Sequence, residues 1–354
     1  MKILHLTSGV APDAVEQQFE RLAGALQGHG VEQYLLMGSL SPRGERVQAL
    51  GIETRQIDFP GRFRFLDKRT INGEIRRFAP DIVMSWAPAL GALVESDGPV
   101  HLGRLAHGFD LSLVANCSHL LAPSRVRADK AVAAGWSSGR AHVVPPLLGP
   151  DAIAAGKQTA AKAVARKTYF TPSTTTVVLT ATQLDADCGL DVLIKAIARL
   201  SGFYLWIAGD GPARTILEEY AHEMGVKPRV RFLGWQDDLR PFLAVSDMFV
   251  SPGAQDDTGE FLLEAWAAGI PVIAADSLGP GLIIRQRENG VLVPVGDAIN
   301  MAEAIKWLSR DPEAARGLGA AGAAAFAENW TMAGVFPQYM TLFEELAKKP
   351  ASMG

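Results

Sequence analysis

The sequence predicts an α/β protein built from two doubly wound, Rossmann-like domains. Its 354 residues exceed one ordinary domain, because a typical domain has roughly 150 residues. Short apolar segments alternate with amphipathic helical segments, which is typical of parallel sheets with both faces covered. The alternation breaks at the Pro-rich residues 145–150 and then restarts. We therefore expect one domain over residues 1–148 and a second over residues 149–334.

The first half opens with a strand, a loop and a helix. Residues 2–6 form an apolar run suited to a buried strand, and Ser8 and Gly9 follow it. Phe19, Leu22 and Leu26 then recur at the spacing of one helix face. Further strands are expected at residues 32–37, 82–85, 100–105, 120–122 and 141–144.

The second half repeats the alternation. The expected strands are 177–180, 204–208, 229–233, 248–250 and 272–274, and the expected helices are 190–200, 214–224, 239–245, 261–268 and 298–308. Parallel strands end at the same edge of their sheet, and ligands of doubly wound folds bind there. In a protein with two such domains, we expect a ligand-binding cleft between them.

Composition excludes several classes of function. Residues 1–150 contain 16 Lys and Arg against 14 Asp and Glu, and the remainder contains 18 against 24, so the halves carry +2 and −6. Neither half is basic enough for general nucleic-acid binding. Two cysteines are too few for a disulfide framework, and the longest uncharged apolar run, residues 82–94, contains Ser85 and Pro88. We expect a soluble, cytoplasmic protein without a metal site.

Six motifs occur in order in the second half. They are Ile207 to Pro212 (IAGDGP), Val230 to Trp235 (VRFLGW), Ser246 to Pro252 (SDMFVSP), Leu262 to Ala274 (LLEAWAAGIPVIA), Glu288 to Pro294 (ENGVLVP) and Trp330. This series resembles the retaining glycosyltransferases of family 4, the glycosyl transferases group 1, which have the GT-B fold. The resemblance is strong over residues 177–345. It implies that the two domains face each other across a cleft and that residues 335–354 cross back to the first domain.

The resemblance also implies a function. Such enzymes transfer a sugar from a nucleotide-sugar donor to a glycan or lipid-linked acceptor with retention, and a hexosyltransferase of bacterial surface polysaccharide is expected. The second domain binds the donor, with UDP or GDP as its nucleotide, and the first binds the acceptor. No cofactor is required. The enzyme would be cytoplasmic, at most peripheral at the inner face of the cell membrane.

The donor site is expected around the helix at residues 261–268. Backbone N–H groups at a helix start bind phosphate oxygens, so Gly259, Glu260, Phe261 and Leu262 are the expected diphosphate ligands. The resemblance implies that Glu264 binds the ribose hydroxyls. It also places a carboxylate eight residues earlier, on the donor sugar, where this sequence has Asp256.

The resemblance assigns the remaining walls of the site. Gly234 and Trp235 would border the nucleotide base through their backbone. His107 would face the sugars, together with Ser8 and Gly9, and is expected to be catalytic alongside Asp256. His5, by contrast, is expected to be a buried, hydrogen-bonded histidine.

Three departures concern the diphosphate subsite. The family places an Arg and, five residues later, a Lys in the first loop of the second domain, and this sequence has Gln183 and Cys188 there. Each lost charge-assisted bond is worth about 1.5 to 3 kcal/mol. Asp13 also adds a negative charge to the first loop of the chain, where the family has a Gly pair.

Several explanations of these departures stay open. Arg285, Arg287 or Lys195 is a candidate replacement cation, or the donor differs in its phosphate geometry. The protein is alternatively a degenerate, non-catalytic member that binds a glycan or protein partner. Asp185 and Asp187 suggest a divalent ion, although a short Asp-x-Asp in a loop is usually a turn former. A nicotinamide dehydrogenase is disfavoured because Gly-x-Gly-x-x-Gly is incomplete after Gly211.

Residues 61–78 carry six cations against two anions, interleaved with apolar residues. One interpretation is contact with an anionic membrane surface. The other is a surface helix with its apolar face in the core and its basic face in water.

Overall fold

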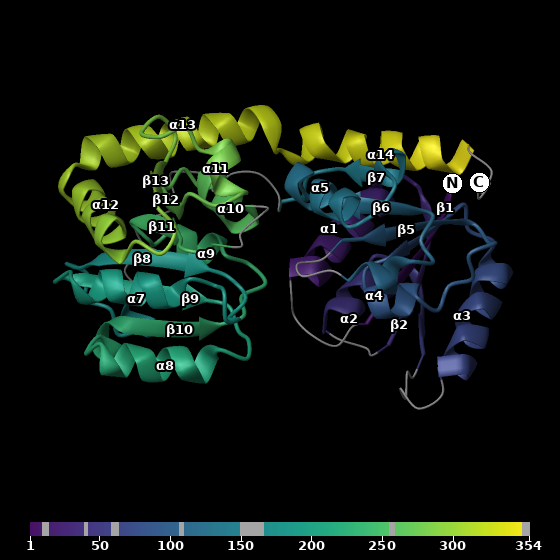
Figure 1. The fold of residues 1–354 in the computed structure, drawn as a ribbon, viewed down its shortest axis with the longest axis horizontal. Helices are drawn as coiled ribbons and strands as arrows, with labels where there is room; N and C mark the ends of the chain where they lie inside the picture. The colour runs from purple at the N-terminus through teal and green to yellow at the C-terminus, as the bar shows by residue number, and fades with distance from the viewer. Residues whose placement is uncertain are drawn as a thin grey trace. The chain divides into compact units, whose positions relative to one another are not determined.

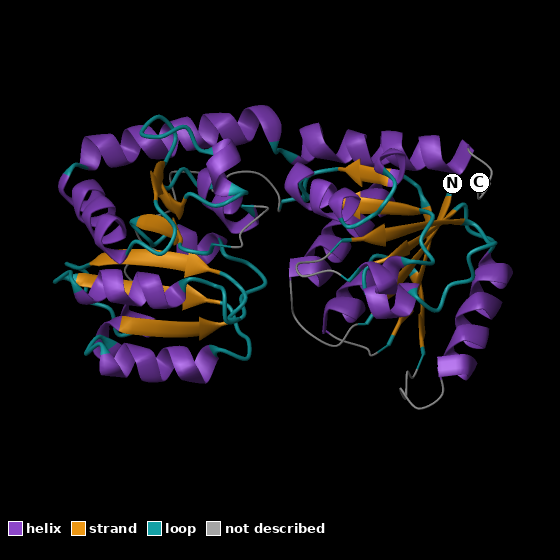
Figure 2. Cartoon of the chain, viewed as in Figure 1, coloured by secondary structure: helices purple, strands orange, loops and turns teal. Residues whose placement is uncertain are grey.

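The computed structural model describes residues 1–8, 14–38, 42–57, 64–105, 110–148, 166–254 and 259–348. Contacts divide the chain into two compact units, shown in Figure 1. Unit 1 comprises Met1–Leu147 and Met332–Gly354, and unit 2 comprises Leu148–Thr331. Each unit consists of one parallel sheet with helices packed against it, so both are α/β units (Figure 2).

The described part of unit 1 contains a seven-stranded sheet in the order β3-β2-β1-β4-β5-β6-β7. Its strands are β1 (Lys2–Thr7), β2 (Glu32–Met37), β3 (Glu53–Gln56), β4 (Ile82–Ser85), β5 (Val100–Arg104), β6 (His119–Ala122) and β7 (Ala141–Val143). Its helices are α1 (Ala14–Gly28), α2 (Pro42–Ala49), α3 (Arg64–Phe78), α4 (Pro88–Gly91), α5 (Arg125–Ala133) and α14 (Met332–Lys348), with the short 3-10 helices η1 (Leu111–Val114) and η2 (Ser138–Arg140). The strand order reverses between β1 and β4, which is where doubly wound sheets bind ligands.

The last helix of the chain belongs to unit 1. Val335, Phe336 and Phe343 of α14 are buried in the same cluster as Phe19 of α1. The Tyr339 hydroxyl donates a hydrogen bond of 3.1 Å to the carbonyl oxygen of Pro145. The expected return of the C-terminal helix to the N-terminal domain is therefore confirmed.

The described part of unit 2 contains a six-stranded sheet in the order β10-β9-β8-β11-β12-β13. Its strands are β8 (Thr176–Ala181), β9 (Phe203–Ala208), β10 (Val230–Gly234), β11 (Met248–Ser251), β12 (Val272–Ala275) and β13 (Val291–Val293). Its helices are α7 (Leu190–Ala198), α8 (Arg214–Glu223), α9 (Arg240–Leu243), α10 (Glu260–Ala267), α11 (Pro280–Ile283), α12 (Ala298–Arg310) and α13 (Pro312–Asn329), with the 3-10 helix η3 (Lys227–Arg229). Here the order reverses between β8 and β11.

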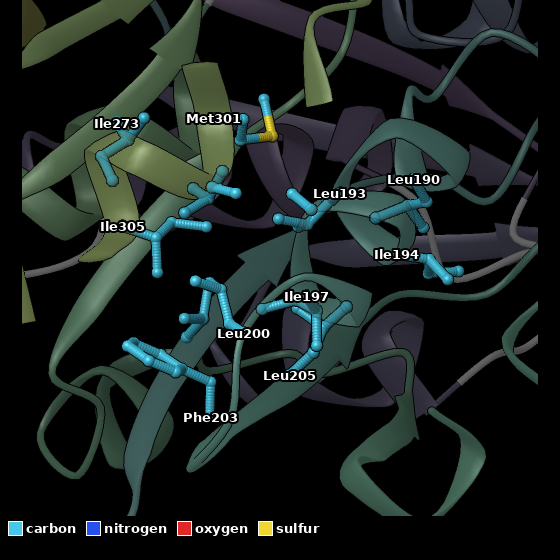
Figure 3. Packing of buried hydrophobic residues seen from close by; sticks show 14 of the residues in the cluster. Leu190, Leu193, Ile194, Ile197, Leu200, Phe203, Leu205, Ile273, Met301 and Ile305 are labelled. Carbon is cyan, nitrogen blue, oxygen red and sulfur yellow. The ribbon is translucent and has the colours of Figure 1, made fainter. Parts of the chain in front are cut away.

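Alternating side chains of the strands of unit 2 build two apolar layers. Val178 and Val250 lie on one face with α7 and α12, whereas Leu179 and Phe249 lie on the other with α10. Figure 3 shows part of the first layer, where Leu193 of α7 faces the same apolar space as α12. This burial holds β8 and β11 rigidly, so the loops at their carboxyl ends start from fixed positions.

Four elements differ from the sequence expectation. Strand β3 has the sequence Glu-Thr-Arg-Gln and lies at a sheet edge, so it lacks the apolar pattern on which prediction depends. Strand β13 has three residues, and α13 contains three glycines that lower its helix propensity. The short helix α11 follows Gly279, in a Gly-Pro-Gly segment for which no helix was predicted.

No helix within the described ranges is both long enough and apolar enough to cross a membrane. Helix α3 buries Ile71 and Ile75 against the sheet of unit 1. Arg76 pairs with Glu95 at 3.3 Å, and Arg77 pairs with Glu53 at 3.0 Å. This arrangement agrees with the surface-helix interpretation for the described side chains of residues 61–78.

Candidate functional site

The carboxyl edge of the sheet of unit 2 is formed by loops whose backbones approach each other closely. A Cβ on Gly209 would lie 1.9 Å from the carbonyl oxygen of Thr182, and one on Gly211 would lie 2.4 Å from that of Leu184. A Cβ on Gly189 would lie 2.3 Å from the carbonyl oxygen of Pro252. All three glycines have positive φ. The loops after β8, β9 and β11 therefore pack together through glycine backbone.

Helix α10 begins at this edge. Gly259 adopts the left-handed conformation (φ 63°) and precedes the first helical residue, Glu260. The Leu263 N–H donates to the Gly259 carbonyl at 2.9 Å, which starts the helical ladder. The N–H groups of residues 260–262 precede that ladder, and the helix dipole adds positive potential there. The arrangement is suited to binding an anion such as a phosphate.

Two carboxylates lie on α10, four residues apart and hence on the same face. Glu260 is buried in the first turn, and Glu264 is half-buried one turn later. The pKa of Arg240 on α9 is raised, first by its hydrogen bonds to Asp238 and also by the charge of Glu264. Glu264 thus lies within electrostatic reach of a guanidinium that sequence reasoning missed.

Gly234 ends β10 and has a φ of 72°, and its carbonyl accepts a hydrogen bond of 2.8 Å from the Gly209 N–H. Trp235 follows and donates from Nε1 to Asp237 at 3.0 Å. A guanidinium nitrogen of Arg214 lies 3.8 Å from the place where a Cβ on Gly234 would be. The expected base-binding residues therefore lie at the same sheet edge as α10, with Arg214 beside them.

Arg214 was not among the sequence candidates. It begins α8 and pairs with Asp210 at 3.2 Å and with Glu218 at 2.9 Å. Asp210 lies in the loop after β9, outside the helix, so the spacing of residues within one helix could not have indicated this pair.

Gln183 and Cys188 lie in different environments. The Gln183 side chain is exposed on the loop after β8, whereas Cys188 is buried in the core beside Leu184 and Leu190. Burial raises the pKa of the Cys188 thiol, so it stays neutral. Neither side chain brings a positive charge to the edge.

The candidate replacement cations do not converge on α10. The Lys195 ammonium contacts Asp191 at 3.3 Å and lies over the ring of Tyr220. The Arg287 guanidinium lies 5.2 Å from the centre of the Trp307 ring. For Arg285 the structure gives a backbone contact, in which its N–H donates to Asn289 Oδ1 at 2.7 Å.

Asp185 accepts a hydrogen bond from the Asp187 N–H at 3.2 Å, which is the turn expected of a short Asp-x-Asp. Across the ranges that the structure describes, no group of three or more His, Cys, Asp and Glu side chains is arranged to hold a metal ion. The geometry therefore gives no support to the divalent-ion interpretation of this pair.

Three of the expected residues, Asp256, His107 and Gly9, lie outside the described residues. Ser8, next to Gly9, follows the end of β1. The expected roles of these three residues in catalysis and sugar binding stay predictions.

The carboxyl edge of the sheet of unit 1 carries buried polar side chains. Thr7, the last residue of β1, donates to the Glu16 carboxylate in the first turn of α1. Gln17 and Gln18 of α1 are also buried, and so is Arg104, the last residue of β5. This edge presents hydrogen-bonding side chains, whereas the edge of unit 2 presents backbone.

His5 is buried in a hydrogen-bond network, as expected. Its Nδ1 accepts from Trp86 Nε1 at 3.2 Å, which leaves Nε2 to donate to Gln33 at 3.1 Å. Burial lowers the pKa of His5 to about 4. The ring is therefore neutral near pH 7 and holds β1, β2 and the start of the loop after β4 together.

Comparisons with known proteins place this geometry in a family. The family described as Glycosyl transferases group 1 matches residues 175–311, which include all the glycine loops and α10. The chain is 33% identical over 355 residues to the lipopolysaccharide core biosynthesis glycosyltransferase LpsE of Rhizobium meliloti, covering 99% of this chain and 100% of that protein. It is 29% identical to LpsD of the same organism, covering 97% and 98% of the two chains.

Solved structures agree on the fold. The Anabaena protein HepE, crystallised with UDP and glucose, superposes with a TM-score of 0.83 at 17% identity over 97% of this chain and 99% of that one. The predicted GT-B fold is thereby confirmed. The match to LpsE spans both units at an identity that establishes kinship, and the chain therefore belongs to the group 1 glycosyltransferases.

Proposed function

We propose that this protein transfers a hexose from a UDP- or GDP-linked donor to a saccharide or lipid-linked acceptor of a bacterial surface polysaccharide, with retention at the anomeric carbon. The observation that carries the proposal is the end-to-end similarity to LpsE, whose name assigns it to lipopolysaccharide core biosynthesis. The group 1 relationship gives the reaction class. The donor, acceptor and stereochemistry are our inference.

The geometry of unit 2 supports a nucleotide-sugar donor. A diphosphate leaving group gains negative charge as its bond to the sugar breaks, and preorganised donors that face this charge lower the barrier. The N–H groups at the start of α10 are such donors, and Glu264 is placed one turn away to accept bonds from ribose hydroxyls. HepE was crystallised with UDP and glucose, which is consistent with this assignment.

The proposed chemical step combines these groups with Asp256 and His107, whose roles the family resemblance implies. The N–H groups of Glu260, Phe261 and Leu262 would hold the diphosphate while its bond to the anomeric carbon breaks and the sugar becomes cationic. The acceptor hydroxyl oxygen would form the new bond to that carbon, and the departing diphosphate would take the hydroxyl proton. Asp256 would stabilise that cation, and His107 would contact the sugar hydroxyls. Loss of the Arg and Lys at positions 183 and 188 leaves more of the charge stabilisation to the backbone and to Arg214. No metal or cofactor is required in this proposal.

A non-catalytic binding protein is the alternative. This alternative arises because the family's Arg and Lys are missing, and Gln183 and Cys188 indeed carry no positive charge. The full-length relatives, however, carry the names of glycosyltransferases, which favours an active enzyme. A measurement of nucleotide affinity distinguishes the active enzyme from the non-catalytic binding protein, because the binding protein need not retain affinity for a nucleotide.

The test of the donor site is Glu264→Gln. It removes the charge but keeps the shape, so we expect about tenfold weaker nucleotide binding, equivalent to ~1.4 kcal/mol, with little change in stability. Glu219→Gln, at an exposed position of α8, is the matched control. Calorimetric titration with UDP and GDP measures both variants. Equal affinity in Glu264→Gln and the native protein would contradict the ribose assignment.

A further inference from the structure

Asp210 and Arg214 form an accessible ion pair at the carboxyl edge of the sheet of unit 2. Asp210 lies in the loop after β9, and Arg214 is the first residue of α8. The Nη1 of Arg214 donates to Oδ2 of Asp210 at 3.2 Å, and the two side chains are 34% and 53% exposed. Because both side chains are partly exposed, a ligand at this edge can reach them.

The guanidinium group of Arg214 is held in place and keeps donating capacity. Its Nε donates to Glu218 at 2.9 Å, and its Cζ lies 5.9 Å from the centre of the Phe232 ring. Within the described ranges, the structure gives no hydrogen-bond partner for Nη2. One edge of a rigid planar donor therefore remains available to a ligand.

The carboxylate of Asp210 keeps accepting capacity. Its Oδ1 accepts from the Gly211 N–H at 2.9 Å, and its Oδ2 accepts from Arg214. Each carboxylate oxygen can accept two hydrogen bonds, so each can accept one more. The ion pair therefore presents a donor followed by two acceptors, in the order Arg214, Oδ2 and Oδ1 of Asp210.

The position of the pair fits the base of a nucleotide. With phosphates at the start of α10 and the ribose at Glu264, the ribose lies near α9, because Glu264 is close enough to raise the pKa of Arg240. Helix α9 follows the loop that leaves the end of β10, so the base points toward this strand end. There Nη1 of Arg214 lies 3.8 Å from the place where a Cβ on Gly234 would be.

We propose that Arg214 and Asp210 read the base of the donor nucleotide and select guanine. This rests on the proposed function, which places a nucleotide in unit 2, and it narrows the donor to GDP-linked sugars. Guanine presents one acceptor, O6, followed by two donors, N1–H and N2–H, which is the complement of the ion pair. The charge of Arg214 still raises the electrostatic potential at the diphosphate.

Uracil matches the pair less well. It presents O4, N3–H and O2 in order, so its third group is an acceptor that would face Oδ1 of Asp210. Two acceptors that face each other repel, and neither gains a hydrogen bond in return for lost hydration. Adenine offers one acceptor and one donor to the pair, and hence one hydrogen bond fewer than guanine.

Calorimetric titration of the full-length protein with GDP, UDP and ADP tests the selection. We expect the native chain to bind GDP about tenfold more tightly than UDP, and Arg214→Gln to lose this preference through weaker binding of GDP. Arg316→Gln, at an exposed position of α13, is the matched control and should retain the preference.

Asp210→Asn adds a test that a purely structural role would not pass. Xanthosine diphosphate carries an oxygen where GDP carries the N2 amino group, and the asparagine amide donates where the carboxylate accepts. We therefore expect this variant to bind xanthosine diphosphate about tenfold more tightly than the native chain does, and GDP more weakly. A folded Asp210→Asn without this gain overturns the proposal.

The titrations separate this inference from the function beneath it. A native chain that binds UDP or ADP as tightly as GDP, or an Arg214→Gln variant that still prefers GDP, overturns the base selection and leaves the donor site standing. A native chain that binds none of the three nucleotides contradicts the proposed function itself. If Arg214→Gln fails to fold, Arg214→Lys decides: it loses the planar fork, so a weaker preference for GDP is expected, and an unchanged preference overturns the proposal.

Discussion

The two sheets present their carboxyl edges in different ways. In unit 2, Gly189, Gly209 and Gly211 let three loops pack through backbone, and the functional groups are chiefly main-chain N–H groups. In unit 1 the edge is made of buried side chains, among them Glu16 and Arg104. The difference explains why the second half of the sequence carries recognisable motifs: backbone sites require glycine at fixed positions, whereas side-chain sites can use many residue types.

The interiors differ as well. Unit 1 buries two histidines, His5 and His101, and burial lowers the pKa of each to about 4. In unit 2 the one histidine in the sequence, His222, is exposed on α8. The stability of unit 1 should therefore depend on pH through these two histidines. The apolar layers of unit 2 do not contain a buried histidine.

The largest effect is expected from Gly209→Ala. The new Cβ would lie 1.9 Å from the Thr182 carbonyl oxygen at a φ of 137°, so the loops after β8 and β9 must separate. We expect a loss of about 3 kcal/mol or more in the free energy of unfolding. Denaturant unfolding measures it.

Gly225→Ala is the control for Gly209→Ala. Gly225 has a φ of 70°, but a Cβ there would meet nothing within 4 Å, so backbone strain alone should cost ~1 kcal/mol. Equal losses in the two variants would show that close packing of the loops contributes nothing.

The next effect is an acid sensitivity of unit 1. The unfolded chain binds protons at His5 and His101 near pH 6.5, but the folded chain binds them only near pH 4. The two histidines therefore contribute fully to the free energy of unfolding above pH 6.5. The free energy of unfolding falls as the pH decreases toward 4, by about 1.4 kcal/mol per pH unit for each histidine in that window. Equilibrium unfolding at pH 7, 6 and 5 measures the slope.

His5→Gln removes one of the two titrations. Its slope between pH 6.5 and 4 should be smaller than that of the native chain, whatever its absolute stability. His222→Gln, at the exposed position in unit 2, should leave the slope unchanged. A native-like slope in His5→Gln would contradict the assignment of the lowered pKa to His5.

The smallest effect concerns α3. Its buried apolar residues leave Lys68 and Arg69 exposed, so any membrane contact through the described side chains would be electrostatic and worth about 1 kcal/mol per cation. We expect weak co-sedimentation with anionic liposomes, lost at high salt and reduced by Lys68→Gln with Arg69→Gln. Lys306→Gln on α12 is the control. Absence of binding to anionic liposomes would exclude the membrane-surface interpretation of residues 61–78.

Much of the fold could be predicted from the sequence because buried parallel strands are short apolar runs. Strand β3 could not, since its polar residues occupy a sheet edge. Helix α13 could not either, because Gly319 and Gly322 weaken its pattern. The structure explains both glycines: a Cβ on Gly319 would lie 2.3 Å from the Gly269 carbonyl oxygen, and one on Gly322 would lie 2.3 Å from the Trp266 ring.

The candidate site likewise has features that could be predicted from the sequence and features that could not. The positions of Gly259, just before α10, and of Glu264 on α10 followed from the spacing of the motif that carries the resemblance. The burial of Cys188, the approach of Arg240 to Glu264, and the meeting of Arg214 with Asp210 depend on contacts between separate elements. Periodicity within one segment holds no information about such contacts.

The central claim is that unit 2 binds a nucleotide-sugar without the family's two cations. Thermal unfolding with saturating UDP, GDP, ADP and CMP, each with and without magnesium, tests it most directly. A ligand at about 100 times its Kd adds ~2.7 kcal/mol, which raises the Tm by several degrees. We expect such a shift with UDP or GDP, independent of magnesium. No shift with any nucleotide would contradict it, and a shift that requires magnesium would assign the missing charge to a metal ion.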